Sequence, residues 1–371
     1  MSFPVDRLVR SHLSPTEGYT PGASELTDRP VVRLDWNESP YGLSPRAREA
    51  LLTFNHGNRY PSYDQAALRA ALARYTGIPA ERIVPGAGLD DVFNTIAMLL
   101  IEPGDEVIVS EPTFGVYRSL FSLHRGVVRN VPLGPAPDFG LDVDGILGAI
   151  TDRTKLVMLC NPNNPTGHLL PREDVERIVD GARCLVGIDE AYAEFSGSSH
   201  IDLAHSRDNV VLFRTLSKFA GLAGFRVGYG MVPEPLAPYL PRVMPPFCNI
   251  STLAAEVAIA SLHDLDELNA NRDRILAERE RVRAALAALP GVVPYPSATN
   301  FILFALPVDD SSGVQSALAE RDIFVRRFGR PELGLTNCLR VTIGTPEEND
   351  AFLAALQEVL LALPVTTSRF A

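Results

Sequence analysis

The segment "FRTLSKFAGLAGFRVGY", residues 213–229, follows a run of strand-forming apolar residues and contains Lys218. The chain has 34 lysine and arginine residues, and Lys155 is its only other lysine. Arginine can take most surface charge roles of lysine, but a guanidinium cannot form a Schiff base. A lysine kept at this position, eight residues before Arg226, therefore indicates an amine with a chemical role.

Four segments of the middle of the chain share one pattern, in which a β-rich apolar run leads into polar residues. They are residues 105–114, 155–167, 184–195 and 209–218. Strands that are apolar on both faces predict a parallel sheet covered by helices. Polar residues at the carboxyl ends of such strands lie where open α/β sheets bind ligands.

The two ends of the chain differ from this middle part. Residues 1–45 are expected to form an irregular, Pro-containing arm that enters a helix near Pro45, and residues 46–269 the large domain. Residues 270–289 predict a long charged amphipathic helix. Strands in "ATNFILFAL" and "CLRVTIGT" should flank the helix "GVQSALAERD". We therefore expect residues 270–371 to form a small α/β domain, with the arm packed on it.

The composition of the chain disfavours some classes of binding partner and gives no sign of a metal site. With 45 acidic and 34 basic residues the formal charge is −11, which disfavours nucleic acid and anionic membranes as partners. The first 30 residues lack the apolar core of a signal peptide, so a cytoplasmic location is expected. The scattered cysteines, without clustered histidines, predict buried thiols and no metal site; they are Cys160, Cys184, Cys248 and Cys338.

An imine-forming lysine is useful when it binds a carbonyl cofactor, and pyridoxal 5'-phosphate (PLP) is the cofactor that makes carbanions at the α-carbon of amino acids. Such a site needs an acid at the pyridine nitrogen, which Asp189 in "IDEAY" could supply. The ring phenolate needs donors such as Asn164 in "NPNNPTG" and Tyr192, and Phe114 in "EPTF" could stack on the ring. Lys218, once released, would act as the general base.

The cofactor phosphate needs cationic and hydroxyl donors and a helix amino terminus. Ser217 and Arg226 could supply the first, and "PGAGLDDVFNTIAMLL" the second, through backbone N–H groups near Leu89 and Asp90. Each fragment alone also fits an ordinary turn, cap or loop. Their joint order along the chain favours a cofactor site.

These motifs in this order resemble the class I/II aminotransferases of PLP fold type I, and most of all their histidinol-phosphate aminotransferase branch. The resemblance covers nearly the whole chain, from "LDWNESPYGLSP" through "NPNNPTG", "DEAYAEF" and "RTLSKFAGLAGFRVGY" to "CLRVTIGT". It implies an α/β fold: a large domain with a mostly parallel seven-stranded sheet flanked by helices, and a smaller α/β C-terminal domain.

The resemblance also assigns roles to individual residues. Lys218 would attach to PLP, with Asp189 at the pyridine nitrogen. The other cofactor contacts it implies are Asn164 and Tyr192 at the phenolate, Phe114 at the ring-stacking position, and Leu89, Asp90, Thr215, Ser217 and Arg226 at the phosphate. In this family Tyr60 reaches the phosphate held by the neighbouring subunit, which implies a homodimer with two shared sites.

The substrate end would be held by Arg340 in "CLRVTIGT", the family's anion anchor. A planar guanidinium pairs bidentately with a carboxylate or a phosphate. In the histidinol-phosphate branch a second arginine, from the segment "IFVRRF", joins Arg340 on the substrate phosphate. Arg326 is the better match to this arginine, and Arg327 is possible. The alternative interpretation of the two arginines is a basic edge strand without a binding role. Asn37 in "WNESP" belongs to the N-terminal arm, which the resemblance implies closes over the pocket.

Departures from the family pattern leave the amino donor open. "GAGLDD" has Leu89 where the family commonly has Ser and Asp91 where it has Glu, and "NRYPSYD" has Ser62 and Tyr63 in a usual Y-P-D-P stretch. We expect transfer of an amino group from histidinol phosphate, or a related amino acid or amine, to 2-oxoglutarate. The alternatives are an aromatic amino acid aminotransferase, a PLP-dependent decarboxylase of a phosphorylated amino acid such as threonine phosphate, and a silent regulatory protein. The pathway stays open between histidine synthesis and aromatic or specialised metabolism.

Overall fold

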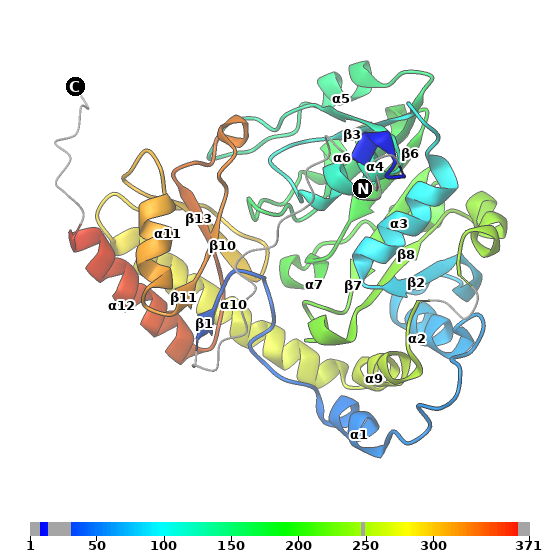
Figure 1. The fold of residues 1–371 in the computed structure, drawn as a ribbon, viewed down its shortest axis with the longest axis horizontal. Coiled ribbons are helices and arrows are strands. Elements are labelled where there is room, and N and C mark those ends of the chain that lie inside the picture. Colours follow the sequence, from blue (N-terminus) through cyan, green and yellow to red (C-terminus); the bar gives the residue numbers. More distant parts are fainter. Residues whose placement is uncertain (1–7, 14–30, 246–248, 363–371) are drawn as a thin grey trace, which may run out of the picture.

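The computed structural model describes residues 8–13, 31–245 and 249–362 and contains a seven-stranded sheet of order β2-β8-β7-β6-β5-β3-β4 (Figure 1). The strands are β2 (Ile83–Ala87), β3 (Glu106–Val109), β4 (Val127–Asn130), β5 (Thr154–Cys160), β6 (Leu185–Asp189), β7 (Val210–Thr215) and β8 (Val227–Met231). β7, β6, β5, β3 and β4 run parallel, and β8 is antiparallel to both β2 and β7. The predicted sheet is confirmed.

Helices cover both faces of this sheet, as its apolar strands require. One face packs against α3 (Leu89–Leu100) and α4 (Val116–Leu123). The other packs against α2 (Ala66–Thr76), α6 (Arg172–Gly181) and α8 (Ile201–Ser206). Because strand side chains alternate between faces, each residue at a strand end is directed to one of these two layers.

The C-terminal part contains a smaller antiparallel sheet of order β12-β13-β10-β9, drawn on the left of Figure 1. Its elements are β9 (Val293–Pro294), β10 (Phe301–Ala305), β12 (Arg326–Arg327), β13 (Cys338–Thr342), α10 (Leu265–Ala288), α11 (Ser312–Ala319) and α12 (Pro346–Ala362). The expected strands and helices are present. The predicted domain boundary after residue 269 lies inside α10, which is one continuous helix, and the division into domains stays a proposal.

The N-terminal arm joins the C-terminal part through strand pairing. β1 (Val32–Arg33) pairs in parallel with β11 (Ile323–Phe324), which supports the expected packing of the arm there. After the arm, α1 (Pro45–Thr53) begins at the predicted proline and packs against α9 (Thr252–Leu262). The remaining helices are α5 (Val143–Ala149), α7 (Ala193–Ser196) and the 3-10 helices Ser11–Leu13, Ala80–Arg82, Ala223–Phe225, Glu234–Arg242 and Pro331–Leu333.

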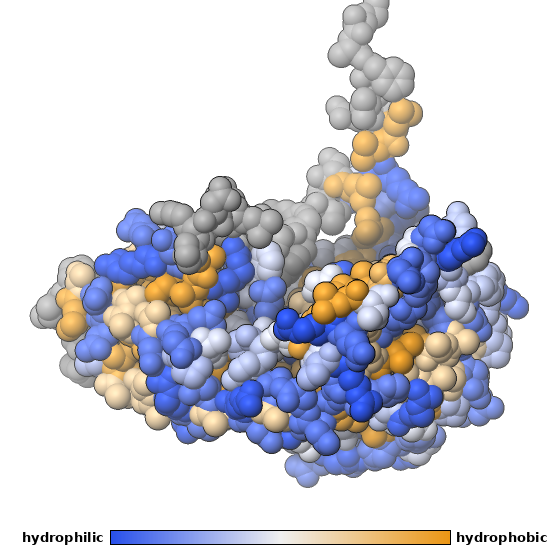
Figure 2. All heavy atoms as spheres, turned by 90° about the horizontal axis from the view of Figure 1, so that it is seen from below, coloured by the Kyte–Doolittle hydropathy of each residue, from blue (hydrophilic) through white to orange (hydrophobic). Residues whose placement is uncertain are grey.

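The face drawn in Figure 2 is largely hydrophilic. Figure 2 shows one face on which hydrophobic residues occupy small, separate areas. None of the helices within the described ranges has the length and apolar composition that crossing a bilayer requires. Those ranges also contain no group of three His, Cys, Asp or Glu side chains arranged to hold a metal ion. Cys160, Cys184 and Cys338 are free thiols, and Cys248 lies outside the described residues.

Gly228 of β8 generates a test of the packing between this strand and the start of α3. A Cβ at Gly228 would lie 2.5 Å from the backbone nitrogen of Leu89 and 2.6 Å from the carbonyl carbon of Gly88. Gly228→Ala should therefore lower the free energy of unfolding by about 1–3 kcal/mol in urea denaturation. Gly224→Ala is the matched control: a Cβ there meets no atom within 4 Å, and a change beyond about 0.5 kcal/mol is not expected. Equal effects of the two substitutions would contradict this explanation.

Candidate active site

A cavity of about 530 Å³ lies at the carboxyl ends of β5, β6 and β7. It is lined by the predicted site residues Asn37, Leu89, Asp90, Phe114, Asn164, Asp189, Tyr192, Thr215, Ser217, Lys218, Arg226, Arg326 and Arg340. Tyr60 does not line it and is 83% exposed. Arg327 is also outside the lining and pairs with Asp310 at 2.7 Å, so Arg326 is the member of the arginine pair that reaches the cavity.

One end of the cavity has the donors that a phosphate group needs. Gly88 precedes α3 with φ 84°, and having no side chain it cannot cap the first N–H groups of the helix. The Thr215 hydroxyl donates to Ser217 Oγ at 2.9 Å. Arg226 has a left-handed φ of 54°, a conformation that is costly for a non-glycine residue and common at functional sites. Its guanidinium lies 3.8 Å from Asp90.

Asp189 lies at the other end, where β6 ends. It is 3% exposed, and burial raises its pKa to about 6. Tyr117 on α4 donates a hydrogen bond to Asp189 Oδ2, and the backbone N–H of Ala191 donates to Oδ1 at 3.0 Å. Both bonds favour the ionised carboxylate and oppose the effect of burial. The Phe114 ring packs edge-on against Tyr117, with 5.5 Å between centroids.

Lys218 follows β7, and its Nζ donates to the backbone carbonyl of Trp36 at 2.9 Å. Burial and the nearby charge of Arg340 lower the pKa of Lys218 to about 8. A larger fraction of this amine is therefore unprotonated at neutral pH than for an ordinary lysine. An unprotonated amine is the form that acts as nucleophile and as base.

Arg340 of β13 is held in one orientation by four neighbours. Nη1 donates to Asn164 Oδ1 and Nη2 to the Asp35 carbonyl, both at 2.5 Å. The guanidinium also lies over the rings of Phe301 at 5.1 Å and Phe328 at 5.9 Å. Such cation–π contacts and hydrogen bonds keep the planar cation in place before an anion arrives.

Asn37 supports other site residues from the arm. With φ 55°, it donates from Nδ2 to the Tyr192 hydroxyl at 2.9 Å and accepts from Thr342 Oγ1 at 3.2 Å. Burial raises the pKa of Tyr192, which therefore keeps its proton for donation. Both ends of the Asn37 amide thus contact protein groups, although the residue lines the cavity.

Eight lining residues were not predicted as site residues: Asp35, Trp36, Glu38, Val116, Cys160, Ala191, Ala223 and Gly224. Tyr117, which does not line the cavity but donates to the lining residue Asp189, was not predicted either. For Tyr117 a signal existed in its place in the chain, because it stands three positions after Phe114; its backbone N–H donates to the Phe114 carbonyl at 3.2 Å, in the turn that enters α4. Asp35 and Trp36 act here through backbone carbonyls, which have no signature in side-chain identity.

Comparison with known proteins agrees with this geometry. Residues 29–356 match the model of the aminotransferase class I and II family. The chain belongs to this family. The aminotransferase is 43% identical to histidinol-phosphate aminotransferase of Roseiflexus castenholzii over 97% of this chain and 100% of that one. It is 40% identical to histidinol-phosphate aminotransferase of Dehalococcoides mccartyi over 97% of this chain and 99% of the relative.

The solved structure of histidinol-phosphate aminotransferase from Sinorhizobium meliloti, in complex with pyridoxal-5'-phosphate, resembles this aminotransferase with a TM-score of 0.82. The two are 30% identical, and the match covers 90% of this chain and 91% of that chain. The family uses PLP as its cofactor. This chain is accordingly a PLP-dependent aminotransferase with small-molecule amino and oxo substrates.

The cavity of the aminotransferase fits PLP on its own geometry. A Cβ at Gly88 would lie 2.2 Å from Arg226 Nη2, so the absence of a side chain there leaves room for a guanidinium at the helix start. Hydroxyls, this guanidinium and a helix amino terminus suit a phosphate. A buried carboxylate at the far end suits a cationic ring nitrogen, and Lys218 provides the amine.

The hydrogen bond from Tyr117 generates a pH prediction. A protonated Asp189 cannot pair with a cationic ring, so binding of pyridoxamine 5'-phosphate to the apo-protein should weaken as pH falls through the pKa of about 6. Tyr117→Phe removes a bond to the ionised form, raises this pKa, and should weaken binding at neutral pH by roughly tenfold. Fluorescence of Trp36, the only tryptophan of the chain and a cavity residue, would follow the titration. Tyr295→Phe, which removes a hydroxyl outside the cavity, is the control and should bind like the wild type. A pH profile of binding for Tyr117→Phe equal to that of the wild type would refute the role of Tyr117 in keeping Asp189 ionised.

Proposed function

We propose that this aminotransferase transfers the amino group of histidinol phosphate to 2-oxoglutarate. The observation that carries the proposal is the presence of Arg340 and Arg326 in the same cavity as Lys218. Two guanidinium groups suit a phosphate dianion, and either can also bind the carboxylate of the second substrate. The names of the relatives support this donor. The reaction would then belong to histidine synthesis, and the expected cytoplasmic location stays a prediction.

Each residue of the cavity would contact the part of the cofactor nearest to it. Arg226, Thr215, Ser217 and the α3 N–H groups at Leu89 and Asp90 would hold the cofactor phosphate. Asp189 would hold the ring nitrogen, Asn164 and Tyr192 would donate to the ring oxygen, and Phe114 would cover the ring face. Asn37 would act by orienting Tyr192.

When bound, the cofactor would withdraw electrons from the α-carbon of the amine that it holds. Lys218 would hold the cofactor at rest and, once displaced by the donor amine, would move the proton at the α-carbon. Its pKa of about 8 suits an amine that alternately takes and returns a proton near neutral pH. The Trp36 carbonyl, which accepts from Nζ, provides a resting position for the displaced amine.

We also propose a homodimer in which Tyr60 completes the site of the partner. Tyr60 is 83% exposed and lies away from the cavity of its own chain, and the neighbouring Tyr63 is 65% exposed. Exposed aromatic side chains close together favour a protein interface. Leu52, at the end of α1, is also exposed.

Steady-state kinetics with candidate donors tests the proposed reaction. Arg326→Gln should raise KM for histidinol phosphate by about tenfold or more, because a charge-assisted bond to phosphate is lost. Arg327→Gln is the matched control and should leave KM unchanged, since this side chain pairs with Asp310 outside the cavity. Lys218→Ala should abolish turnover.

Other outcomes of the same assay contradict the proposal in distinct ways. Turnover with phenylalanine or tyrosine and none with histidinol phosphate would support an aromatic aminotransferase instead. Release of CO2 from threonine phosphate without an oxo acid would support the decarboxylase. Full turnover by Lys218→Ala would remove Lys218 from the chemistry.

Hybrid dimers test the role of Tyr60. Tyr60→Ala and Lys218→Ala chains should each be inactive or strongly impaired. If Tyr60 serves the partner, a hybrid of the two has one site with both residues intact, and mixing the chains should restore activity. Mixtures without recovery, measured after refolding the chains together, would place Tyr60 in its own site or outside the reaction.

A further inference from the structure

The ends of β6 and β7 carry polar side chains on both faces of the sheet. Asp189 lies beside Phe213 in the parallel register, and Asp189 and Thr215 face the α3 and α4 layer and line the cavity. Glu190 and Arg214 occupy the alternate positions and are therefore directed to the opposite layer. Neither of these two lines the cavity. The same two strand ends thus carry a cavity pair on one face and an ion pair on the other.

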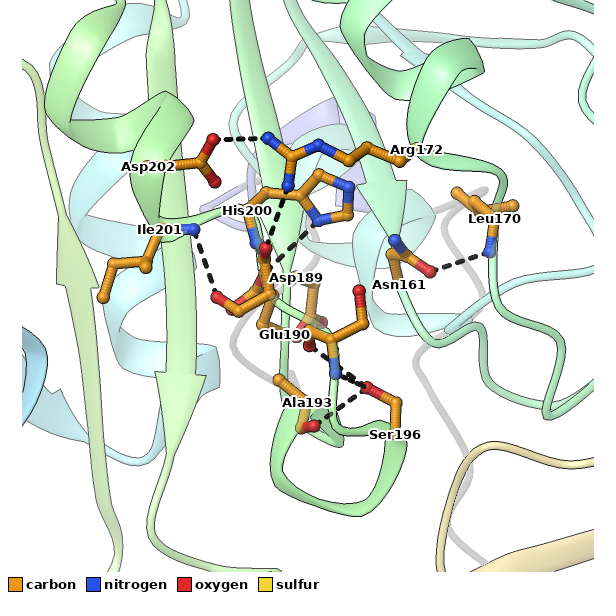
Figure 3. A network of polar contacts seen from close by, with 12 residues as sticks. Asn161, Leu170, Arg172, Asp189, Glu190, Ala193, Ser196, His200, Ile201 and Asp202 are labelled. Atoms are coloured by element: carbon orange, nitrogen blue, oxygen red, sulfur yellow. Dashed lines mark hydrogen bonds and ion pairs between the residues drawn. The ribbon is translucent and has the colours of Figure 1, made fainter.

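Glu190 is saturated by hydrogen bonds within this second layer. Arg214 donates from Nε at 3.0 Å and from Nη2 at 2.8 Å to Glu190 Oε2, which also accepts from Ser199 Oγ at 2.8 Å. The backbone N–H of His200 donates to Oε1 at 2.5 Å. Figure 3 shows Glu190 next to Asp189, with His200 beside it. Two Arg214 nitrogens thus donate to one Glu190 oxygen, and the ion pair spans directly from the end of one strand to the end of the next.

The Glu190 and Arg214 ion pair is buried. Glu190 is 0% exposed and the Arg214 side chain 9%. Burial acts to raise the pKa of Glu190, but the bonds from His200 and the charge of Arg214 hold it below its usual value, so the carboxylate is ionised. A buried ion pair gives little net stability compared with packed apolar residues, whereas its directional bonds fix geometry.

We propose that Glu190 and Arg214 are a positioning pair that sets the separation between the ring end and the phosphate end of the cofactor site. The inference rests on the proposed roles of Asp189 and Thr215. A rigid ligand that contacts both ends gains from their correct spacing, because the second contact forms at high effective concentration. A ligand that contacts one end gains nothing from that spacing.

Binding of three probes to the apo-protein tests the proposal: pyridoxamine 5'-phosphate spans both ends, pyridoxamine contacts the ring end, and inorganic phosphate the other. The variants are Glu190→Gln and the double variant Glu190→Gln with Arg214→Met, which removes both charges of the pair. Glu194, which lies 4.0 Å from Arg214 Nη1, keeps its hydrogen bond from Tyr75 in the double variant. Both should bind pyridoxamine 5'-phosphate about tenfold or more weakly, with unchanged affinity for the two one-ended probes. Trp36 fluorescence reports the first two probes, and competition reports phosphate.

Arg172→Met is the matched control, because Arg172 makes ion pairs with Asp202 (Figure 3) and with Glu176 in the same region but not between strand ends. It should leave all three affinities unchanged. Parallel weakening of all three probes, or unchanged binding of pyridoxamine 5'-phosphate, in both Glu190 variants would overturn the positioning role. A separate variant, Asp189→Asn, should weaken the binding of pyridoxamine. If pyridoxamine binds this variant as tightly as the wild type, the proposed contact between Asp189 and the ring is wrong, and so is the basis of this inference.

Discussion

Burial of ionisable groups at the carboxyl ends of β5, β6 and β7 is the constraint on which the rest of the site depends. Removal from water disfavours charge, so it raises the pKa of Asp189 to about 6 and lowers that of Lys218 to about 8. Each of these groups then needs specific neighbours that keep it in the protonation state that the proposed chemistry requires. Tyr117 and the Ala191 N–H supply them for the carboxylate, and Arg340 for the amine. The polar contacts around the cavity follow from this requirement.

Segments distant in sequence close the cavity. Residues 35–37 of the arm place two carbonyls and one amide against Arg340, Lys218 and Tyr192. On another side, Glu111 after β3 accepts from Arg118 and, at 3.0 Å, from Arg330 of the C-terminal part. These charged contacts link the segment after β3 of the large sheet to the C-terminal part.

The anchoring of Arg340 bears on how one cavity accepts two substrates. Its guanidinium is held by Phe301, Phe328, Asn164 and the Asp35 carbonyl, so its plane is set without a ligand. Carboxylate and phosphate present similar oxygen pairs to such a plane. In the proposed function, discrimination between donors would depend on the groups around Arg340, of which Arg326 lines the cavity.

The sequence by itself determined the parallel strands and the helix starts at Pro45 and Leu89, and its motifs predicted PLP as the cofactor, because periodicity and rare residue types are local properties. It also singled out most cavity-lining residues through strand-end motifs. The resemblance favoured Arg326 with Arg327 possible, and the tertiary structure decided that Arg326 reaches the cavity and Arg327 does not, since alternation in a two-residue strand depends on its register. The contacts of Tyr117, the Asp35 and Trp36 carbonyls and the Glu190 and Arg214 pair likewise join elements far apart in the chain, and backbone groups and long-range pairing have no signature in a single sequence.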